Sequence, residues 1–184
     1  MLHELASLTK LKSLNLESNK IEDISCLSSL TNLETLNISY TNIIDTLPLA
    51  NFKNLKKLDL NSTNIDDFSF LSTLTNLTNL NLDYNDITDL SPLKDLTKLT
   101  TLSLQFNKVS DLTPLKNLTN LTELYLPKNN VSDVTPLLNL KNLSILFLNY
   151  NNITDISPLK KLPHLFSLVI NNNPATELPY NIYE

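Results

Sequence analysis

The chain repeats one pattern of apolar and polar positions every 22 residues, without an insertion. Each full unit reads L-x-x-L-x-[LI]-x-x-[NT]-x-[IV] and continues with a second apolar segment. Self-similarity at a step of roughly 20–50 residues is typical of proteins that stack one small structural unit. Seven full units and one partial unit begin at Leu11, Leu33, Leu55, Leu77, Leu99, Leu121, Leu143 and Leu165.

The first half of each unit has the pattern of a short strand. Leu14 and Leu16 are separated by one residue, and this period of two places both side chains on one face of a strand. Stacked units would pair these strands in parallel and bury the leucines between them. We therefore expect the equivalent leucines in the later units to be fully buried: Leu102, Leu104, Leu124, Leu126, Leu146 and Leu148.

The second half of each unit has the pattern of a short helical segment. Leu27 and Leu30 lie three positions apart, so one helical turn would direct both inward. Ser and Thr are preferred helix N-caps and Pro suits the first helical position, so we predict a helix or 3₁₀ turn capped by the hydroxyl residue. The Ser/Thr-Pro pairs stand at Ser91-Pro92, Thr113-Pro114, Thr135-Pro136 and Ser157-Pro158.

These elements predict a single curved α/β solenoid. One unit cannot bury its own leucines, whereas a stack of units buries them as a continuous core. The strand side is the narrower side, so a parallel sheet should line the concave face and the helical segments the convex face. We expect one array over residues 1–184, with a partial N-terminal repeat (1–10), seven 22-residue repeats (11–164), and a partial repeat with a C-terminal tail (165–184).

Two polar columns recur with the same period. An Asn follows each strand, replaced by Thr at Thr41 and Thr63, and we interpret this column as a structural ladder because an amide both donates and accepts hydrogen bonds. A row of Asp residues would either bind divalent cations or accept backbone N–H groups of the next turn. We favour the second interpretation and expect no metal, because a calcium loop usually needs a tight Gly turn and the chain has no Gly. The Asp column is Asp23, Asp45, Asp67, Asp89, Asp111, Asp133 and Asp155.

Several segments resemble a known family. Asp-Ile-Ser-Pro-Leu-Lys-Lys-Leu at 155–162, and Leu-Thr-Asn-Leu at 30–33, 74–77 and 118–121, are similar to the 22-residue leucine-rich repeats of internalins. The phosphatase-regulating SDS22-like proteins use nearly the same repeat. The resemblance covers essentially the whole chain and implies the curved leucine-rich repeat solenoid. The helical cap that precedes internalin repeats, and the Ig-like domain and wall-sorting tail that follow them, are not recognisable in these residues.

Composition excludes most other chemistry. Without Gly there is no phosphate-binding Gly loop, and one Cys forms neither a disulfide framework nor a thiolate zinc site. The net charge of -5 argues against a nucleic-acid binder, and no apolar run approaches the roughly 20 residues that cross a bilayer. His3 and His164 are far apart, and Cys26 has no neighbouring base in sequence. We expect no enzyme, no cofactor, no nucleic acid and no membrane insertion.

The outward strand positions suggest a binding site. They are polar in the first units and become aromatic or aliphatic in the later ones, and exposed apolar clusters of this kind mark interaction sites. Two alternatives stay open: the tail segment Pro179–Tyr183 folds over part of the cluster, or the cluster is a crystal or dimer contact. The candidate partner-binding residues on the concave face are Phe106, Tyr125, Ile145, Phe147, Tyr150 and Val169.

The leading functional hypothesis is a non-enzymatic protein-protein interaction module that uses this face. The internalin resemblance implies a bacterial protein that interacts with a host protein, and the SDS22 resemblance implies a scaffold that holds a phosphatase. The rival hypothesis is a structural or self-associating segment of a larger protein, and the sequence leaves the oligomeric state open. The first residues carry no secretion signal, which favours a cytoplasmic or host-delivered protein unless the chain is a fragment of a secreted or surface protein.

Overall fold

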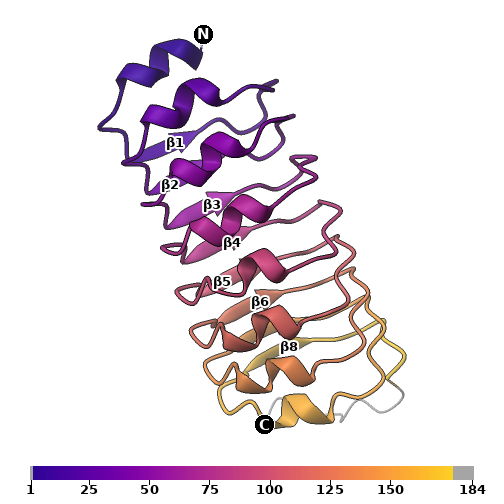
Figure 1. Ribbon diagram of the computed structural model, residues 1–184. Helices are drawn as coiled ribbons and strands as arrows, with labels where there is room; N and C mark the ends of the chain where they lie inside the picture. The colour runs from indigo at the N-terminus through magenta and orange to yellow at the C-terminus, as the bar shows by residue number, and fades with distance from the viewer. Residues whose placement is uncertain (1, 176–184) are drawn as a thin grey trace.

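Eight three-residue strands form one parallel sheet in the computed structural model, which describes residues 2–175. Each strand pairs with the next one in the chain, so the spatial order is β1 to β8 (Figure 1). The register is one repeat at every step: Leu80 of β4 stands opposite Leu102 of β5. The strands are β1 (Ser13–Asn15), β2 (Thr35–Asn37), β3 (Lys57–Asp59), β4 (Asn79–Asn81), β5 (Thr101–Ser103), β6 (Glu123–Tyr125), β7 (Ile145–Phe147) and β8 (Ser167–Val169).

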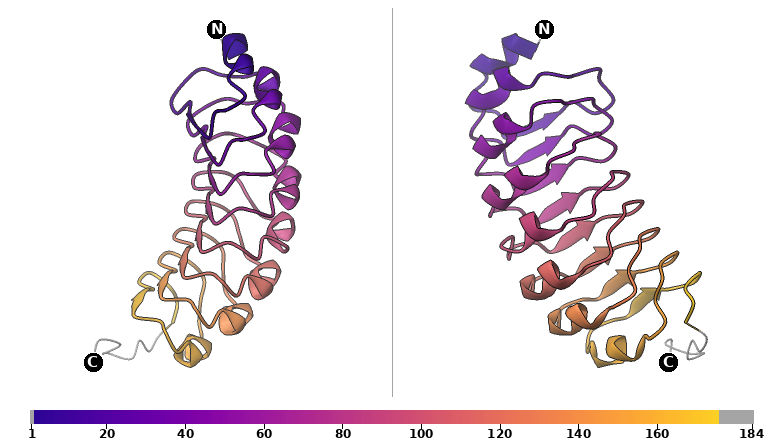
Figure 2. Two further views of the ribbon diagram at one scale, coloured as in Figure 1. Left: turned by 90° about the vertical axis from the view of Figure 1, so that its left-hand side faces the viewer. Right: turned by 45° about the vertical axis from the view of Figure 1, so that its right-hand side comes forward.

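The helical segments between the strands are short 3₁₀ helices. They follow the convex side of the stack, while the sheet lines the concave side (Figure 2). The predicted curved α/β solenoid is therefore confirmed. Within residues 2–175, no helix has the length and apolar character needed to cross a bilayer. The segments are η1 (Leu2–Ser7), η2 (Ser25–Ser29), η3 (Leu47–Asn51), η4 (Ser69–Thr73), η5 (Ser91–Leu93), η6 (Thr113–Asn117), η7 (Thr135–Asn139) and η8 (Ser157–Lys161).

One continuous core runs through the stack between the sheet and the 3₁₀ segments. The six strand leucines predicted to be buried, Leu102 to Leu148, have no exposed surface, so the repeat frame is confirmed. At the first unit the equivalent Leu14 and Leu16 are only half-buried. The preceding segment, η1, packs on η2 and so covers the 3₁₀ side of that unit rather than its strand.

The four 3₁₀ segments with a Ser/Thr-Pro pair begin differently from the sequence prediction. Ser91 is the first residue of η5, its N-cap is Leu90, and no N-cap side chain makes a capping hydrogen bond. Instead, Asp89 Oδ1 accepts the Ser91 backbone N–H at 2.8 Å and Asp89 Oδ2 accepts the Ser91 hydroxyl at 2.6 Å. The prediction of Ser or Thr caps was wrong because a carboxylate two positions earlier already reaches the free N–H. Equivalent carboxylate bonds occur at Asp23, Asp45, Asp67, Asp111, Asp133 and Asp155.

The structural interpretation of the Asp column is thereby confirmed. The Ser91 hydroxyl and then the Ser91 backbone N–H lower the pKa of Asp89, because both hydrogen bonds favour the ionised carboxylate. The pKa of Asp111 is lowered in the same way by the hydroxyl and backbone N–H of Thr113. Among residues 2–175, no three His, Cys, Asp or Glu side chains gather in a way that would hold a metal ion.

The Asn column is a buried hydrogen-bond ladder, as predicted. Asn107 Nδ2 donates to the carbonyls of Leu82 in the preceding unit at 2.9 Å, and of Leu104 and Gln105 in its own unit at 3.1 and 3.2 Å. Its Oδ1 accepts the backbone N–H of Ile87 in the preceding unit at 3.0 Å. One side chain therefore ties two units together. Asn129 and Asn151 make the same set of bonds. Asn85 Nδ2 also donates to three carbonyls, but its Oδ1 accepts the backbone N–H and the hydroxyl of Thr63, each at 3.3 Å.

Candidate functional site

The last three strands carry an apolar patch on the concave face. Tyr125 of β6 stands opposite Phe147 of β7, and Phe147 stands opposite Val169 of β8. The rings of Tyr125 and Phe147 meet edge to face, with centroids 5.2 Å apart at an interplanar angle of 84°. Ile145 lies on the same face of β7, two residues before Phe147. We call these four partly exposed residues, Tyr125, Ile145, Phe147 and Val169, the concave patch.

The ring of Tyr125 is held in place by a second contact. Its hydroxyl donates a 3.1 Å hydrogen bond to Glu123 Oε2 on the same strand. Burial and this hydrogen bond both raise the pKa of Tyr125, so the phenol is neutral at physiological pH. The Tyr125 ring is therefore held both by its contact with Phe147 and by the hydrogen bond of its hydroxyl. A side chain that is already ordered loses less conformational entropy when a partner binds.

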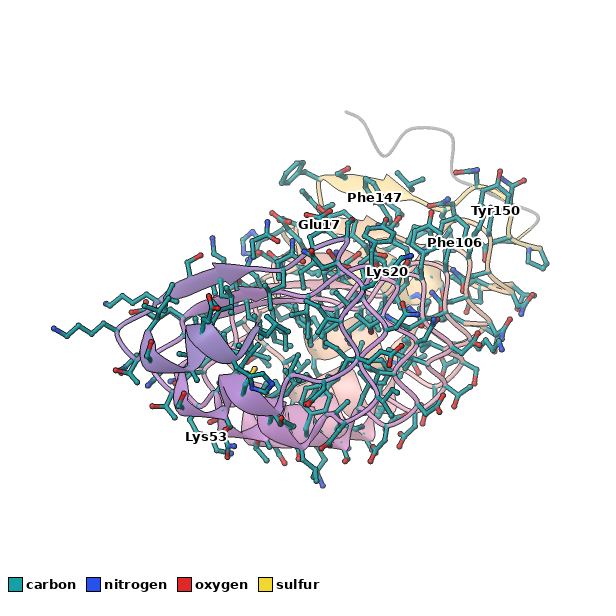
Figure 3. The ribbon with its side chains drawn as sticks, turned by 90° about the horizontal axis from the view of Figure 1, so that it is seen from above. Glu17, Lys20, Lys53, Phe106, Phe147 and Tyr150 are labelled. Atoms are coloured by element: carbon teal, nitrogen blue, oxygen red, sulfur yellow. The ribbon has the colours of Figure 1, made fainter. Side chains whose placement is uncertain are left out.

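The other two predicted residues, Phe106 and Tyr150, occupy a different surface. They lie in the turns that follow β5 and β7 and stand to one side of Phe147 (Figure 3). Tyr84 stacks on Phe106 with ring centroids 4.1 Å apart, and Lys128 Nζ lies 4.4 Å from the Phe106 ring centre and 5.3 Å from that of Tyr150. We call Tyr84, Phe106, Lys128 and Tyr150 the turn strip.

A left-handed backbone conformation separates the turn strip from the strands. The residue at this position has a φ between 53° and 59° in every unit, and none of these residues is Gly. A left-handed L-residue costs roughly 1–2 kcal/mol, which the repeated backbone hydrogen bonds between neighbouring turns must offset. These side chains leave the sheet rather than continue its outward face. The residues are Ser18, Tyr40, Ser62, Tyr84, Phe106, Lys128, Tyr150 and Asn172.

Sequence reasoning therefore joined two surfaces and missed Tyr84 and Lys128. The signal was present, because Tyr40, Tyr84, Phe106 and Tyr150 share one column of the repeat. The sign of φ in that column was the missing fact. Whether the tail segment Pro179–Tyr183 covers the concave patch is a question that lies outside the described residues.

On the concave face of β3 to β5, polar side chains form hydrogen bonds with groups of the neighbouring units. Asp83 is buried, and its carboxylate accepts the Ser103 hydroxyl at 2.6 Å, the Gln105 N–H at 2.7 Å and Gln105 Nε2 at 3.0 Å. Burial raises the pKa of Asp83 despite these hydrogen bonds, because desolvation penalises the charged form. Asn81 Nδ2 likewise donates to Asp59 Oδ2 at 3.3 Å. These polar groups already have partners within the array.

The edge where the strands begin carries a charge cluster. Glu34 accepts hydrogen bonds from Lys12 Nζ at 2.8 Å and Lys56 Nζ at 2.6 Å. The bond from Lys12 and then that from Lys56 lower the pKa of Glu34 to about 2. All three side chains are solvent-accessible, and ion pairs of this kind contribute little to stability. Each of these bonds joins two neighbouring units of the array.

His3 and Cys26, treated as isolated in the sequence, line the same hollow at the N-terminal end. The hollow has a volume of about 730 Å³, and the apolar side chains of Leu5 and Leu16 and the carboxylate of Asp23 also border it. No hydrogen bond joins His3 to Cys26 among the described residues, and the thiol is half-buried against the core. The arrangement does not assemble a nucleophile with a base.

Comparison with known proteins agrees with the fold. The family described as leucine-rich repeats (2 copies) matches residues 9–51, 31–73, 53–95, 75–117, 97–139, 119–161 and 141–181. Internalin C2 from Listeria monocytogenes is 41% identical with a TM-score of 0.88, and the match covers 91% of this chain and 74% of that protein. A second L. monocytogenes internalin, InlF, is 40% identical with a TM-score of 0.90 over 94% of this chain and 52% of that protein.

A more distant structure shares the same fold. A leucine-rich repeat protein from Leptospira interrogans is 26% identical with a TM-score of 0.87 over 94% of this chain and 46% of that protein. The chain thus spans three quarters of internalin C2 and about half of each of the other two proteins. No curated protein sequence matches the chain.

Proposed function

The chain belongs to the leucine-rich repeat family, and from this membership we propose that it binds a protein partner through the concave patch, without catalysing a reaction. Leucine-rich repeat arrays are protein-interaction scaffolds, and the internalins to which this chain is similar share that architecture. The location of the binding surface and the nature of the partner are the parts of this function that we propose.

The observation that supports the location is the edge-to-face pair of Tyr125 and Phe147 on neighbouring strands. Aromatic residues dominate the energetics of interfaces because they bury a large area while losing few rotamers. Ile145 and Val169 extend the apolar surface around the pair. All four side chains stand on strands whose backbone is fixed by the stack, so a partner would meet a preformed surface.

The partner that we propose is a host protein, by analogy with a bacterial internalin-like role. Identities of 41% and 40% to two internalins support this assignment over a phosphatase-regulating scaffold. We also propose that residues 1–184 form one array, which the unbroken parallel register from β1 to β8 supports. The activity of a longer protein would include whatever its further segments contribute.

The experiment is capture of a host protein by the intact array, followed by titration of the purified partner. Phe147→Ala combined with Tyr125→Ala should weaken binding by at least about 2 kcal/mol, because both anchors are removed. The midpoint of unfolding should barely move, since neither side chain is in the core.

The matched control is Asn15→Ala with Asn37→Ala at the polar end of the same outward column, which should weaken binding much less. Equal losses at both ends would instead indicate a partner that spans the whole arc. A loss of stability at Phe147 would show that the patch is buried. A mass that rises with protein concentration and no captured partner would favour the self-associating hypothesis.

A further inference from the structure

The left-handed turn position of the repeat holds one short side chain between two tyrosines. Tyr40, Ser62 and Tyr84 occupy it in three successive units, with φ values of 55°, 53° and 53°. Their backbone N–H groups donate equivalent hydrogen bonds to the next unit, at 2.8, 3.0 and 2.9 Å. The three residues therefore share the sign of φ and the bond to the next unit, although the turn of Ser62 also holds a second left-handed residue, Asn64, with a φ of 54°.

Lys128 shows what this geometry accommodates between two rings. It stands between Phe106 and Tyr150 in the same column, with Nζ 4.4 and 5.3 Å from the two ring centres. Parallel strands lie about 4.8 Å apart, so rings two units apart are separated by roughly 10 Å. One cation at the midpoint is within about 6 Å of both rings, which is the range of a cation–π interaction.

Ser62 stands between Tyr40 and Tyr84 at the same turn position, and its own side chain supplies no cation. Ser62 Oγ donates to Asn61 Oδ1 at 2.8 Å, so the short side chain is engaged with its own turn. Tyr40 and Tyr84 are 51% and 49% exposed. One face of the Tyr84 ring is stacked on Phe106 at an interplanar angle of 14°, so the opposite face is directed toward the unit of Ser62.

Acidic side chains occur a few residues farther along the same turns. Glu22, Asp66 and Asp67 border a hollow of about 400 Å³ whose wall begins two residues beyond Tyr40 and Ser62, at Asn42 and Asn64. Asp86, two residues beyond Tyr84, is exposed on the same edge and pairs with Lys108. The Lys128 arrangement, in which this turn position holds a cation between two rings, favours a positively charged occupant over a neutral one.

We propose that Tyr40, Ser62 and Tyr84 form a binding site for one lysine or arginine side chain of a protein partner. The incoming cation would lie between the rings of Tyr40 and Tyr84, as Lys128 Nζ lies between the rings of Phe106 and Tyr150. This site is separate from the concave patch and lies in the half of the array that lacks an apolar concave surface. A partner would then be held at two places along the arc.

The first test places a cation in the site by mutation. Ser62→Lys should reproduce the Lys128 arrangement, so the ε-methylene protons of the introduced side chain should show an upfield ring-current NMR shift comparable to that of Lys128 in the same spectrum. The matched control is Ser18→Lys, which has Tyr40 on one side and no second ring, and should show a smaller shift. Equal shifts at the two positions, or none at position 62, would overturn the two-ring site.

The second test uses a separate ligand with the wild-type chain. Acetyl-Gly-Arg-Gly-amide should shift the ring signals of Tyr40 and Tyr84 in a saturable way, whereas the citrulline peptide, which is similar in shape but uncharged, should not. Tyr84→Ala should weaken peptide binding about threefold or more, as expected for loss of one cation–π partner, and Tyr84→Phe should retain it. Ser62→Lys should abolish the response by occupying the site.

Equal responses to the arginine and citrulline peptides would contradict a cation site, as would an unchanged response in a folded Tyr84→Ala variant. Phe147→Ala should leave peptide binding unchanged, because the concave patch is a different surface. Failure of the proposed concave interface and failure of this site are therefore distinguishable.

Discussion

Thr41 and Asn107 occupy the same position of the repeat, in the second and fifth units, and they tie the chain together differently. Both are buried. The Thr41 hydroxyl makes one hydrogen bond, to the Ile38 carbonyl of its own unit at 2.6 Å. Asn107 makes four, of which two cross to the preceding unit. At this position the second unit is therefore tied to its neighbour by fewer side-chain bonds than the fifth unit is.

The concave face also changes along the stack, at the step from β5 to β6. In the units of β4 and β5 outward side chains satisfy one another, as Asp83 does with Ser103 and Gln105. In the late strands Tyr125 and Phe147 leave apolar surface partly exposed. Both surfaces stand on strands of the same length and pairing. The side chains of the buried columns and those of the outward columns can therefore vary independently.

The largest predicted effect is a difference in the free energy of unfolding between core substitutions in the later units and in the first unit. Leu104→Ala should lower the free energy of unfolding by about 2–5 kcal/mol, because a fully buried leucine leaves a cavity. Leu14→Ala, at a half-buried position of β1, should cost clearly less. Urea unfolding of both variants is the measurement. A cost at Leu104 below about half a kcal/mol would contradict the repeat frame.

The next effect concerns the polar ladder. Asn107→Ala should destabilise the array by about 1–3 kcal/mol, because it leaves buried carbonyls and the Ile87 N–H without partners. Thr41→Ala removes one hydrogen bond within its own unit and should cost less, about 1 kcal/mol. The same unfolding measurement compares them. If Thr41→Ala cost as much as Asn107→Ala, the additional bonds between units would not contribute to the free energy of unfolding.

A weaker and pH-dependent effect is expected at the starts of the 3₁₀ segments. Asp89→Ala removes bonds to both the N–H and the hydroxyl of Ser91 and should cost about 1 kcal/mol or less at pH 7. The folded-state pKa of Asp89 lies below its ordinary value near 3.8, so this stabilisation is present above that value and is lost as the pH falls through the folded pKa.

Thermal midpoints measured at pH 7 and at pH 2 are the check for this difference. Asp45→Ala is the matched variant, because Asp45 accepts the Leu47 N–H and that residue has no hydroxyl to add. Its effect at pH 7 should be smaller than that of Asp89→Ala. A penalty for Asp89→Ala that grows on acidification would contradict a lowered pKa of the Asp89 carboxyl in the folded state.

Calcium should have no effect on either region. Thermal midpoints in millimolar calcium and in chelator should agree, because the Asp carboxylates already accept backbone N–H groups in both regions. A ligand that binds the native state must stabilise it, so a rise of several degrees in calcium would overturn the capping role of this column.

The repeat, its elements and its core follow from the order of the residues alone. Period two at Leu102 and Leu104 predicted one buried face of a strand, and both residues are fully buried. The Asn ladder and the hydrogen-bonding role of the Asp column also followed from residue type and spacing. These features are local or are repeated without change, so a single unit contains the information that specifies them.

The positions of the side chains outside the core depend instead on how the chain folds in three dimensions. Phe106 and Phe147 were both expected on the concave face, but a positive φ turns Phe106 out of the sheet into the turn strip, whereas Phe147 stays on that face. The caps were misassigned to Ser or Thr because the competing Asp bond depends on how the backbone bends before η5. Residues 22 positions apart become neighbours because the repeats pack on one another. This packing of repeats determines which rings and charges lie side by side.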